Sequence, residues 1–182
     1  MKYKIIYADP PWSYDDKSLN RGGAERHYKT EGNDALSLID VNSIADDDCV
    51  LFMWATFPKI KEALELMEAW GFEYKTNAFT WVKKNKIKDS WFWGMGRWTR
   101  SNAEICLLGV KGKPKRIGMG VHSVIDAKVT KHSQKPEIVK ERIIELMGDL
   151  PRVEMFARRS TEGWDVFGNE VDGINIDNKA KG

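Results

Sequence analysis

Continuous apolar segments alternate with amphipathic helices along this chain, and this alternation restricts the fold more than any other feature of the sequence. Residues 3–8 (YKIIYA) and 49–56 (CVLFMWAT) predict buried strands, since neither shows the regular polar alternation of a half-exposed strand. Residues 58–71 and 135–148 carry apolar side chains at helical spacing and end on glycine. Strands covered on both faces need helices on both sides. The sequence therefore predicts an α/β fold with a mostly parallel central sheet.

The other predicted elements are shorter. A short helix is expected around residues 35–39. Further strands are expected at 72–83, 103–112, 152–157 and 164–170. Three long segments without periodicity are predicted to be loops, which in a compact domain are usually functional or lack fixed structure. These segments are 13–33, 83–102 and 111–131. No linker or repeat interrupts the pattern, so we expect a single domain over residues 1–173 and a flexible tail over 174–182.

Composition excludes several classes of protein. The 182 residues carry a formal net charge of +2, so any preference for nucleic acid must come from the placement of the charges. Cys49 and Cys106 stand in or beside apolar runs and are expected to be reduced and buried. The sequence predicts no metal site, no membrane span and no leader peptide, so the expected location is cytoplasmic.

The first predicted strand ends in Asp9-Pro10-Pro11-Trp12, a sequence suited to ligand chemistry. Ligands of parallel α/β sheets bind at the carboxyl ends of strands. The two prolines remove two backbone donors and fix two φ angles. This leaves one carboxylate, rigid carbonyl acceptors and one large aromatic ring. A plain strand-ending turn would use the same residue types and is the alternative reading.

These four residues fit methyl transfer to the exocyclic amine of a nucleobase. Asp9 and the Pro10 carbonyl would accept the two N–H groups and favour a pyramidal, nucleophilic nitrogen. The ring of Trp12 would stack on the base, a contact that contributes about 1–3 kcal/mol in single-strand binders. A base inside a duplex would have to be flipped out first. Whether Asp9 takes a proton before, during or after transfer stays open at this level.

The chain resembles the MT-A70 family of adenine-N6 methyltransferases, in its bacterial and phage type. The matching segments run in family order and cover residues 3 to about 173. They are ADPPWSY, GGAERHYKT, VLFMWAT, EAWGFEYKT, WVKKN, GMGRWTRSNAEICLLGVKG, HSQKPE and VEMFARRSTEGWDVFGNE. The resemblance implies a circularly permuted, Rossmann-like class I methyltransferase fold with S-adenosylmethionine as cofactor. The catalytic strand would come first and the cofactor strands last.

The resemblance also implies the cofactor-binding residues. Lys135 would contact the carboxylate end of the cofactor, and Asn169 and Glu170 would hold the ribose hydroxyls. The full implied set is Asp9, Lys135, Glu154, Phe156, Arg158, Ser160, Thr161, Asn169 and Glu170. The alternatives are a solvated lysine beside a helix start, a local Glu154–Arg158 ion pair and an ordinary turn at Asn169. The segment FARRSTEGW holds a single glycine, so no generic glycine fingerprint marks this site.

Nucleic-acid contacts are predicted in the loops. Residues 83–88 (KKNKIK) and 111–116 (KGKPKR) are basic and flank predicted strand ends, and Trp91, Trp93 and Trp98 stand in a polar, glycine-rich segment. The predicted contact residues are Tyr14, Arg21, Lys83, Lys84, Arg97, Trp98 and Arg100. The alternative is that these are solvated loops, whose aromatic side chains pack against the protein and fix the loops in place.

The leading hypothesis is an adenine-N6 methyltransferase that acts on DNA. RNA is the nearest alternative, although Arg159-Ser160-Thr161 stands where the RNA-methylating eukaryotic members carry a Pro-His-Asn type of segment. A catalytically silent partner subunit and a protein-amide methyltransferase are further alternatives. Because no separate target-recognition domain is visible, a homodimer or a partner subunit is expected to assist binding.

Overall fold

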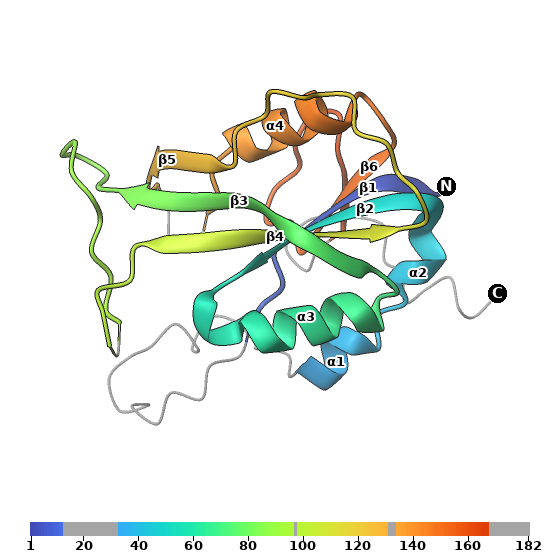
Figure 1. Ribbon diagram of the computed structural model, residues 1–182, viewed down its shortest axis with the longest axis horizontal. Helices are drawn as coiled ribbons and strands as arrows, with labels where there is room; N and C mark the ends of the chain where they lie inside the picture. Colours follow the sequence, from blue (N-terminus) through green and yellow to red (C-terminus); the bar gives the residue numbers. More distant parts are fainter. Residues whose placement is uncertain (13–32, 97, 131–133, 168–182) are drawn as a thin grey trace.

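The computed structural model describes residues 1–12, 33–96, 98–130 and 134–167, and these form one seven-stranded sheet in the order β5-β3-β4-β2-β1-β6-β7 (Figure 1). The strands are β1 (Tyr3–Ala8), β2 (Ala45–Ala55), β3 (Glu73–Lys84), β4 (Ala103–Lys111), β5 (Val124–Lys128), β6 (Arg152–Met155) and β7 (Asp165–Phe167). Within this sheet, β4 alone runs against its neighbours β2 and β3, while the other four pairings are parallel. The prediction of a mostly parallel sheet is confirmed.

Helices cover both faces of the sheet, as the continuous apolar strands require. The helical elements are α1 (Asn33–Ser37), α2 (Val41–Ile44), the 3-10 turn η2 (Phe57–Lys59), α3 (Ile60–Ala69) and α4 (Ile138–Met147). Figure 1 shows α4 on one face and α1 and α3 on the other. Alternate residues of β1 divide between the two cores: Ile6 and Ala8 pack on the α3 side, and Ile5 and Tyr7 pack on the α4 side.

Strands from the two ends of the chain lie side by side at the centre of the sheet. Strand β1 pairs in parallel with β6, with Tyr7 opposite Glu154 and Ala8 opposite Met155. The carboxyl ends of these strands therefore meet at one edge, which we call the carboxyl edge. This edge holds the ends of β1, β2, β3, β5, β6 and β7 and the beginning of β4. The first strand of the chain, β1, thus lies next to β6 from near its end, in agreement with the order of strands that the resemblance implied.

Two sequence predictions about strands are wrong. The segment 111–131 was expected to be irregular, but it contains β5, which pairs in parallel with the end of β3. The strand predicted to begin at Cys49 begins four residues earlier, because Ala45 pairs with Tyr3 at the start of β1. The predicted tail at 174–182 lies outside the described residues. No helix within the described ranges is long and apolar enough to cross a membrane.

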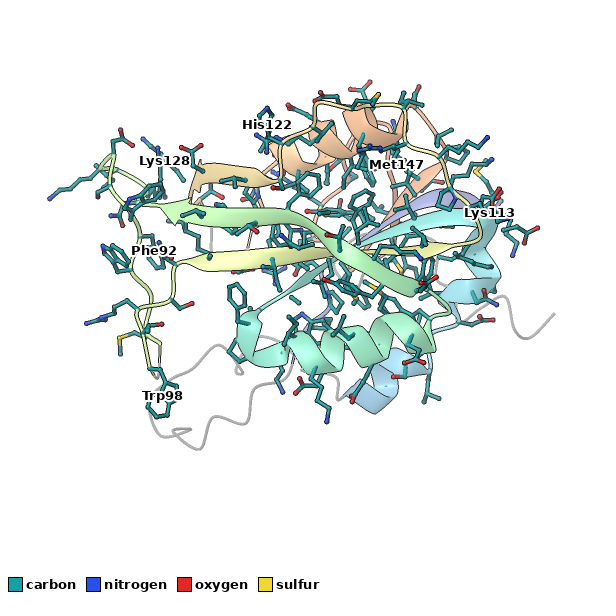
Figure 2. The ribbon with its side chains drawn as sticks, viewed as in Figure 1. Phe92, Trp98, Lys113, His122, Lys128 and Met147 are labelled. Carbon is teal, nitrogen blue, oxygen red and sulfur yellow. The ribbon has the colours of Figure 1, made fainter. Side chains whose placement is uncertain are left out.

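The basic segment 111–116 does not lie near the carboxyl edge. Because β4 is antiparallel, its end at Lys111 pairs with Cys49 in the amino-terminal half of β2. The backbone N–H of Lys113 donates to Asp48 Oδ1 at 2.7 Å. Figure 2 shows Lys113 at the opposite end of the long axis from Lys128 and Trp98. Only one of the two predicted basic clusters, residues 83–88, therefore lies at the carboxyl edge, where the end of β1 also lies.

Candidate active site

Asp9 stands directly after β1 at the carboxyl edge. Side chains alternate along a strand, and Ala8 packs on the α3 side, so Asp9 turns toward the α4 side. There its Oδ2 accepts a hydrogen bond from Lys135 Nζ at 2.9 Å. The next residue, Pro10, accepts the backbone N–H of Trp12 at 2.9 Å. This bond uses one of the two lone pairs of the Pro10 carbonyl and leaves the other for a ligand.

Trp12 does not offer the open stacking surface that the sequence predicted. Its side chain is 7% exposed and belongs to the core cluster on the α3 side. Its indole Nε1–H donates to the carbonyl of Trp54 on β2 at 3.0 Å. The aromatic ring therefore fixes the turn after β1 against its neighbouring strand, and its role in the structure is positional.

Lys135 joins two strand ends across the top of β2. Its ammonium group lies 2.9 Å from Asp9 Oδ2, 3.3 Å from Glu104 Oε2 and 5.5 Å from the centroid of the Trp54 ring. Its side chain is 12% exposed. Burial lowers the pKa of Lys135, but the carboxylates of Asp9 and Glu104 raise it more, so the pKa lies above its ordinary value. Lys135 is therefore a fixed cation at neutral pH.

Glu104, at the start of β4, completes a chain of four alternating charges. It also forms an ion pair with Lys83 at the end of the neighbouring strand β3. Burial raises the pKa of Glu104, but the ammonium groups of Lys135 and Lys83 lower it more, and the pKa falls below its ordinary value. The resulting order is Asp9, Lys135, Glu104 and Lys83, and its formal charges cancel.

Two aromatic side chains form the floor beneath these charges. Trp54 Nε1–H donates to the hydroxyl of Tyr7 at 2.7 Å, so the indole under Lys135 is itself held in place. Burial raises the pKa of Tyr7 well above its ordinary value, which keeps the phenol neutral. The Tyr7 ring in turn meets the edge of Trp164 at 5.8 Å between centroids.

A second ion pair lies beside the first, at the end of β6. Glu154 is opposite Tyr7 in the sheet and thus faces the same side as Asp9. Its Oε2 lies 2.6 Å from Lys140 Nζ on α4. Burial raises the pKa of Glu154 and the Asp9 charge adds to this, while Lys140 lowers it. The net shift is upward. Glu154 thus has an ion-pair partner on α4, which the sequence did not indicate.

The hydrogen-bond donors and acceptors at the carboxyl edge suit a ligand that is an amino acid and that carries a second positive charge in addition to its ammonium group. Such a ligand carries one carboxylate, for which Lys135 is the donor, and positive charge, for which Asp9 and Glu154 are acceptors. Comparison with known protein families then matches residues 3–170 to MT-A70. The chain belongs to the MT-A70 family.

Two relatives illustrate how this MT-A70 chain compares with characterised proteins. It is 36% identical over 200 residues to "Type II methyltransferase M.MunI" from Mycoplasma sp, a match that covers 100% of this chain and 83% of that protein. It is 30% identical over 179 residues to "N(6)-adenosine-methyltransferase catalytic subunit METTL3" from Homo sapiens. That match covers 96% of this chain and 29% of the human protein, so the chain spans less than a third of that relative.

The structure separates the implied cofactor residues of this MT-A70 chain into groups. Asp9, Lys135 and Glu154 come together on the α4 side. Phe156 instead stacks on Trp70, with the rings 6.4 Å apart, and its φ of 61° lies in the left-handed region where non-glycine residues are strained. Arg158 and Ser160 are exposed directly after β6 and Thr161 is half-buried. Asn169 and Glu170 lie outside the described residues.

The predicted nucleic-acid residues fall into three groups: paired lysines, residues outside the described ranges, and exposed residues of the connection between β3 and β4. Lys83 pairs with Glu104, and Lys84 pairs with Asp126 at 3.0 Å and with Asp89 at 3.4 Å. Both lysines therefore have carboxylate partners inside the protein, and the predicted phosphate contacts would have to be made beside these ion pairs. Of the remaining predicted contacts, Tyr14, Arg21 and Arg97 lie outside the described residues.

The connection between β3 and β4 presents the exposed aromatic surface of this edge. Trp98 is 99% exposed and projects from the far end of this connection (Figure 2). Trp93 is 60% exposed and, with Arg100, lines a hollow of about 550 Å³. Trp91 is anchored by Lys84, whose ammonium lies 5.5 Å from its ring centroid. The connection thus combines open aromatic rings with cations and starts at the carboxyl edge of the sheet, the edge at which Asp9 also stands.

Sequence reasoning missed Glu104, Trp54 and Lys140. Glu104 had one usable signal, because a lone acid at the start of an apolar strand must find a partner. Trp54 was read only as part of a core strand. In the sequence, Lys140 stands next to the apolar stripe of its helix and has the pattern of an ordinary solvated lysine. Its partners, on β6 and in the segment that follows β6, are distant in sequence and therefore gave no local signal.

Proposed function

We propose that this chain transfers a methyl group from S-adenosylmethionine to the N6 amine of adenine in DNA. Membership of the MT-A70 family supports the methyltransferase class and the adenine amine. The observation that supports the site most strongly is Asp9 at the carboxyl edge, 2.9 Å from Lys135 and beside the end of β6. The choice of DNA rests on the bacterial and phage type of the segment 157–170 and on the 36% identity to a Type II methyltransferase.

Each residue has a defined task in this proposal. S-adenosylmethionine supplies an activated methyl group on a sulfonium. Lys135 holds the carboxylate end of that cofactor, and Glu154 is an acceptor beside it. Asp9 and the free lone pair of the Pro10 carbonyl accept the two N–H groups of the adenine amine. Because a sulfonium is already activated, alignment of the amine is the main contribution that the protein must make.

Lys135 holds one oxygen of Asp9 in the structure, at 2.9 Å. An ionised carboxylate has about four lone-pair sites on its two oxygens, so Asp9 Oδ1 can accept the amine while Lys135 stays on Oδ2. Glu104 also holds Lys135 in the site at 3.3 Å, and the third hydrogen of the ammonium group would serve the carboxylate of the cofactor.

The connection between β3 and β4 is proposed to hold the nucleic acid. Its open rings, Trp93 and Trp98, suit stacking on unpaired bases, and Arg100 suits a phosphate. The basic segment 111–116 lies at the opposite end of the molecule and is not part of this surface. A domain of this size reads few bases alone, so a second copy of the chain or a partner subunit is proposed to assist. A monomer with strong site selectivity would contradict that. A cytoplasmic location is part of the same proposal.

One experiment separates the proposed substrate from its alternatives. The chain is incubated with isotope-labelled S-adenosylmethionine and, in separate reactions, with single-stranded DNA, duplex DNA and RNA of the same base sequence. Nucleosides are then analysed by mass spectrometry. We expect labelled N6-methyldeoxyadenosine from DNA. Label only in RNA adenosine would overturn the choice of DNA, and no label together with no heat of cofactor binding would indicate a silent subunit.

The variant Asp9→Ala tests the role of the Asp9 carboxylate in the same assay. It removes the acceptor for the amine, but Lys135 keeps Glu104 as a partner, so cofactor binding is expected to persist in calorimetry while methylation is lost. Full activity of Asp9→Ala would refute the role assigned to the carboxylate.

A further inference from the structure

Lys140 is the one charged side chain in the described part of the chain that is buried. It lies on α4 and is 7% exposed. Lysine is almost never buried unless it is paired, because removing an ammonium group from water costs several kcal/mol. Its neighbours in the helix, Val139 and Ile143, are part of the core on the α4 side. The position of this cation therefore calls for an explanation in terms of its partners.

The ion-pair partner and the hydrogen-bond partner of Lys140 flank the carboxyl end of β6. Its Nζ lies 2.6 Å from Glu154 Oε2 and donates to Thr161 Oγ1 at 2.6 Å. The ring of Trp164 closes a third side, with its centroid 5.9 Å from the ammonium. Glu154 is on β6, and Thr161 belongs to the short connection from β6 to β7. One ammonium group thus ties α4 to both sides of the strand end where the cofactor is proposed to bind.

We infer that Lys140 is a positioning residue for the cofactor, whose ammonium keeps the Glu154 carboxylate charged and oriented as an acceptor at the end of β6. This inference rests on the proposed function, which assigns Glu154 to the cofactor site. Lys140 itself is turned toward the protein interior and acts through Glu154. Its hydrogen bond to Thr161 links the segment after β6 to α4.

The charged groups around Glu154 explain why a cation is needed there. From β1, the Asp9 carboxylate and the buried Tyr7 phenol face it. From α4, only Lys140 among the described residues offers a compensating charge. Burial and Asp9 both raise the pKa of Glu154, and Lys140 opposes them. Without Lys140, burial and Asp9 would act unopposed, and the carboxyl would take up a proton at a higher pH than in the wild type.

A purely structural role predicts a different result. If Lys140 only joined α4 to β6, its loss would weaken the fold and reduce cofactor affinity by the same factor at every pH. If it sets the charge of Glu154, the loss of affinity depends on pH and follows the titration of that one carboxyl. The pH profile therefore separates the two roles.

The test uses Lys140→Met, which keeps the length and removes the charge, and Lys140→Arg, which keeps the charge. Glu154→Gln and the double variant Lys140→Met/Glu154→Gln complete a double-mutant cycle. The dissociation constant for S-adenosylmethionine is measured by calorimetry between about pH 6 and 9, a range that includes the pKa values of documented buried glutamates. In the same proteins without cofactor, the Glu154 carboxyl is titrated by carbon-13 NMR, with its signal assigned by its loss in Glu154→Gln.

We expect Glu154 to titrate at higher pH in Lys140→Met than in the wild type. The ratio of the Lys140→Met and wild-type dissociation constants should rise about tenfold per pH unit between that midpoint and the lower midpoint of the wild type, and should be constant below both, since each unit removes tenfold of the charged form. Lys140→Arg should stay within about twofold of the wild type, and adding Lys140→Met to Glu154→Gln should change affinity by a factor independent of pH. At saturating cofactor, kcat of Lys140→Met should approach that of the wild type.

Two results would overturn the inference. An unchanged Glu154 midpoint in Lys140→Met would show that the ammonium does not control the carboxyl. A ratio of dissociation constants that does not follow the midpoint would show that the charge of Glu154 does not matter to the cofactor. A wild-type chain that binds no S-adenosylmethionine at any pH would instead overturn the proposed function and this inference with it, whereas binding with a pH-independent ratio would overturn the inference alone.

Discussion

Replacing Glu104 with glutamine removes the central negative charge from the chain of four charges at the carboxyl edge. In the wild type, Glu104 is an ion-pair partner of both Lys83 and Lys135, and the three side chains are 12–20% exposed. Hydrogen bonds to charged groups contribute about 1.5–3 kcal/mol each. The partial exposure screens these bonds, and glutamine retains one oxygen acceptor. We therefore expect Glu104→Gln to lower the free energy of unfolding by about 2 kcal/mol, which for a domain of this size lowers Tm by about 4–8 °C.

The pH dependence of this difference provides the sharper measurement. The pKa of Glu104 in the folded chain lies below its ordinary value of 4.5, so the unfolded chain binds the proton more readily. The stability from this carboxylate is fully present above about pH 4.5 and is lost as the pH falls through the lowered value. Urea denaturation at several pH values should therefore show the gap between wild type and Glu104→Gln closing on acidification.

Glu73→Gln is the matched control for this measurement. Glu73 also pairs with a lysine, Lys75, at 2.6 Å, but the two side chains are 74% and 44% exposed. Such a surface pair contributes about 0–1 kcal/mol. A Glu104→Gln effect no larger than the control at neutral pH, or a gap that is constant from neutral to acid pH, would refute the account of the charge chain given above.

Two further predictions concern packing and nucleic-acid binding. Gly109→Ala should lower the free energy of unfolding by about 1–3 kcal/mol in urea denaturation, because the added Cβ would lie 2.5 Å from Met67 Sδ, whereas Gly120→Ala meets nothing within 4 Å and should be neutral. Equal stabilities of these two variants would contradict the packing of β4 against α3. Trp98→Ala should weaken binding of a fluorescently labelled single-stranded oligonucleotide by about five- to a hundredfold in anisotropy, the range expected for one stacked base, while Met119→Ala, which is also exposed, should leave it unchanged. A change below twofold for Trp98→Ala would remove that ring from the proposed surface.

The sequence was sufficient where local chemistry decides the structure. Strand β1 has the predicted bounds because an apolar run is followed by Asp9 and two prolines, which cannot continue a ladder. The helices α3 and α4 follow from their apolar spacing. Strand β5 was missed because Val124–Lys128 is short and at the sheet edge, so it carries no continuous apolar run.

The site was predicted only in part, since its contacts join segments that are distant in sequence. Asp9 and Lys135 were identified from their motifs, but their mutual ion pair spans 126 residues and depends on the order of the strands. Trp12 was assigned to the substrate because tryptophan stacks well on bases, and nothing in the local sequence revealed that Trp54 offers its indole a buried acceptor. Burial of Lys140 likewise depends on β6 lying beneath α4.

The reversed direction of β4 has a consequence for how such a protein can change over evolution. Two antiparallel neighbours are joined at one edge, so the segment from Asn85 to Asn102 is anchored at both ends by the β3–β4 ladder. Insertions or deletions in that segment leave the register of every strand intact. They also leave in place the acid after β1, the lysine before α4 and the glutamate of β6, which come from other parts of the chain. If this hairpin holds the nucleic acid as proposed, altered sequence preference can arise from it while the three residues proposed for the transfer are inherited unchanged.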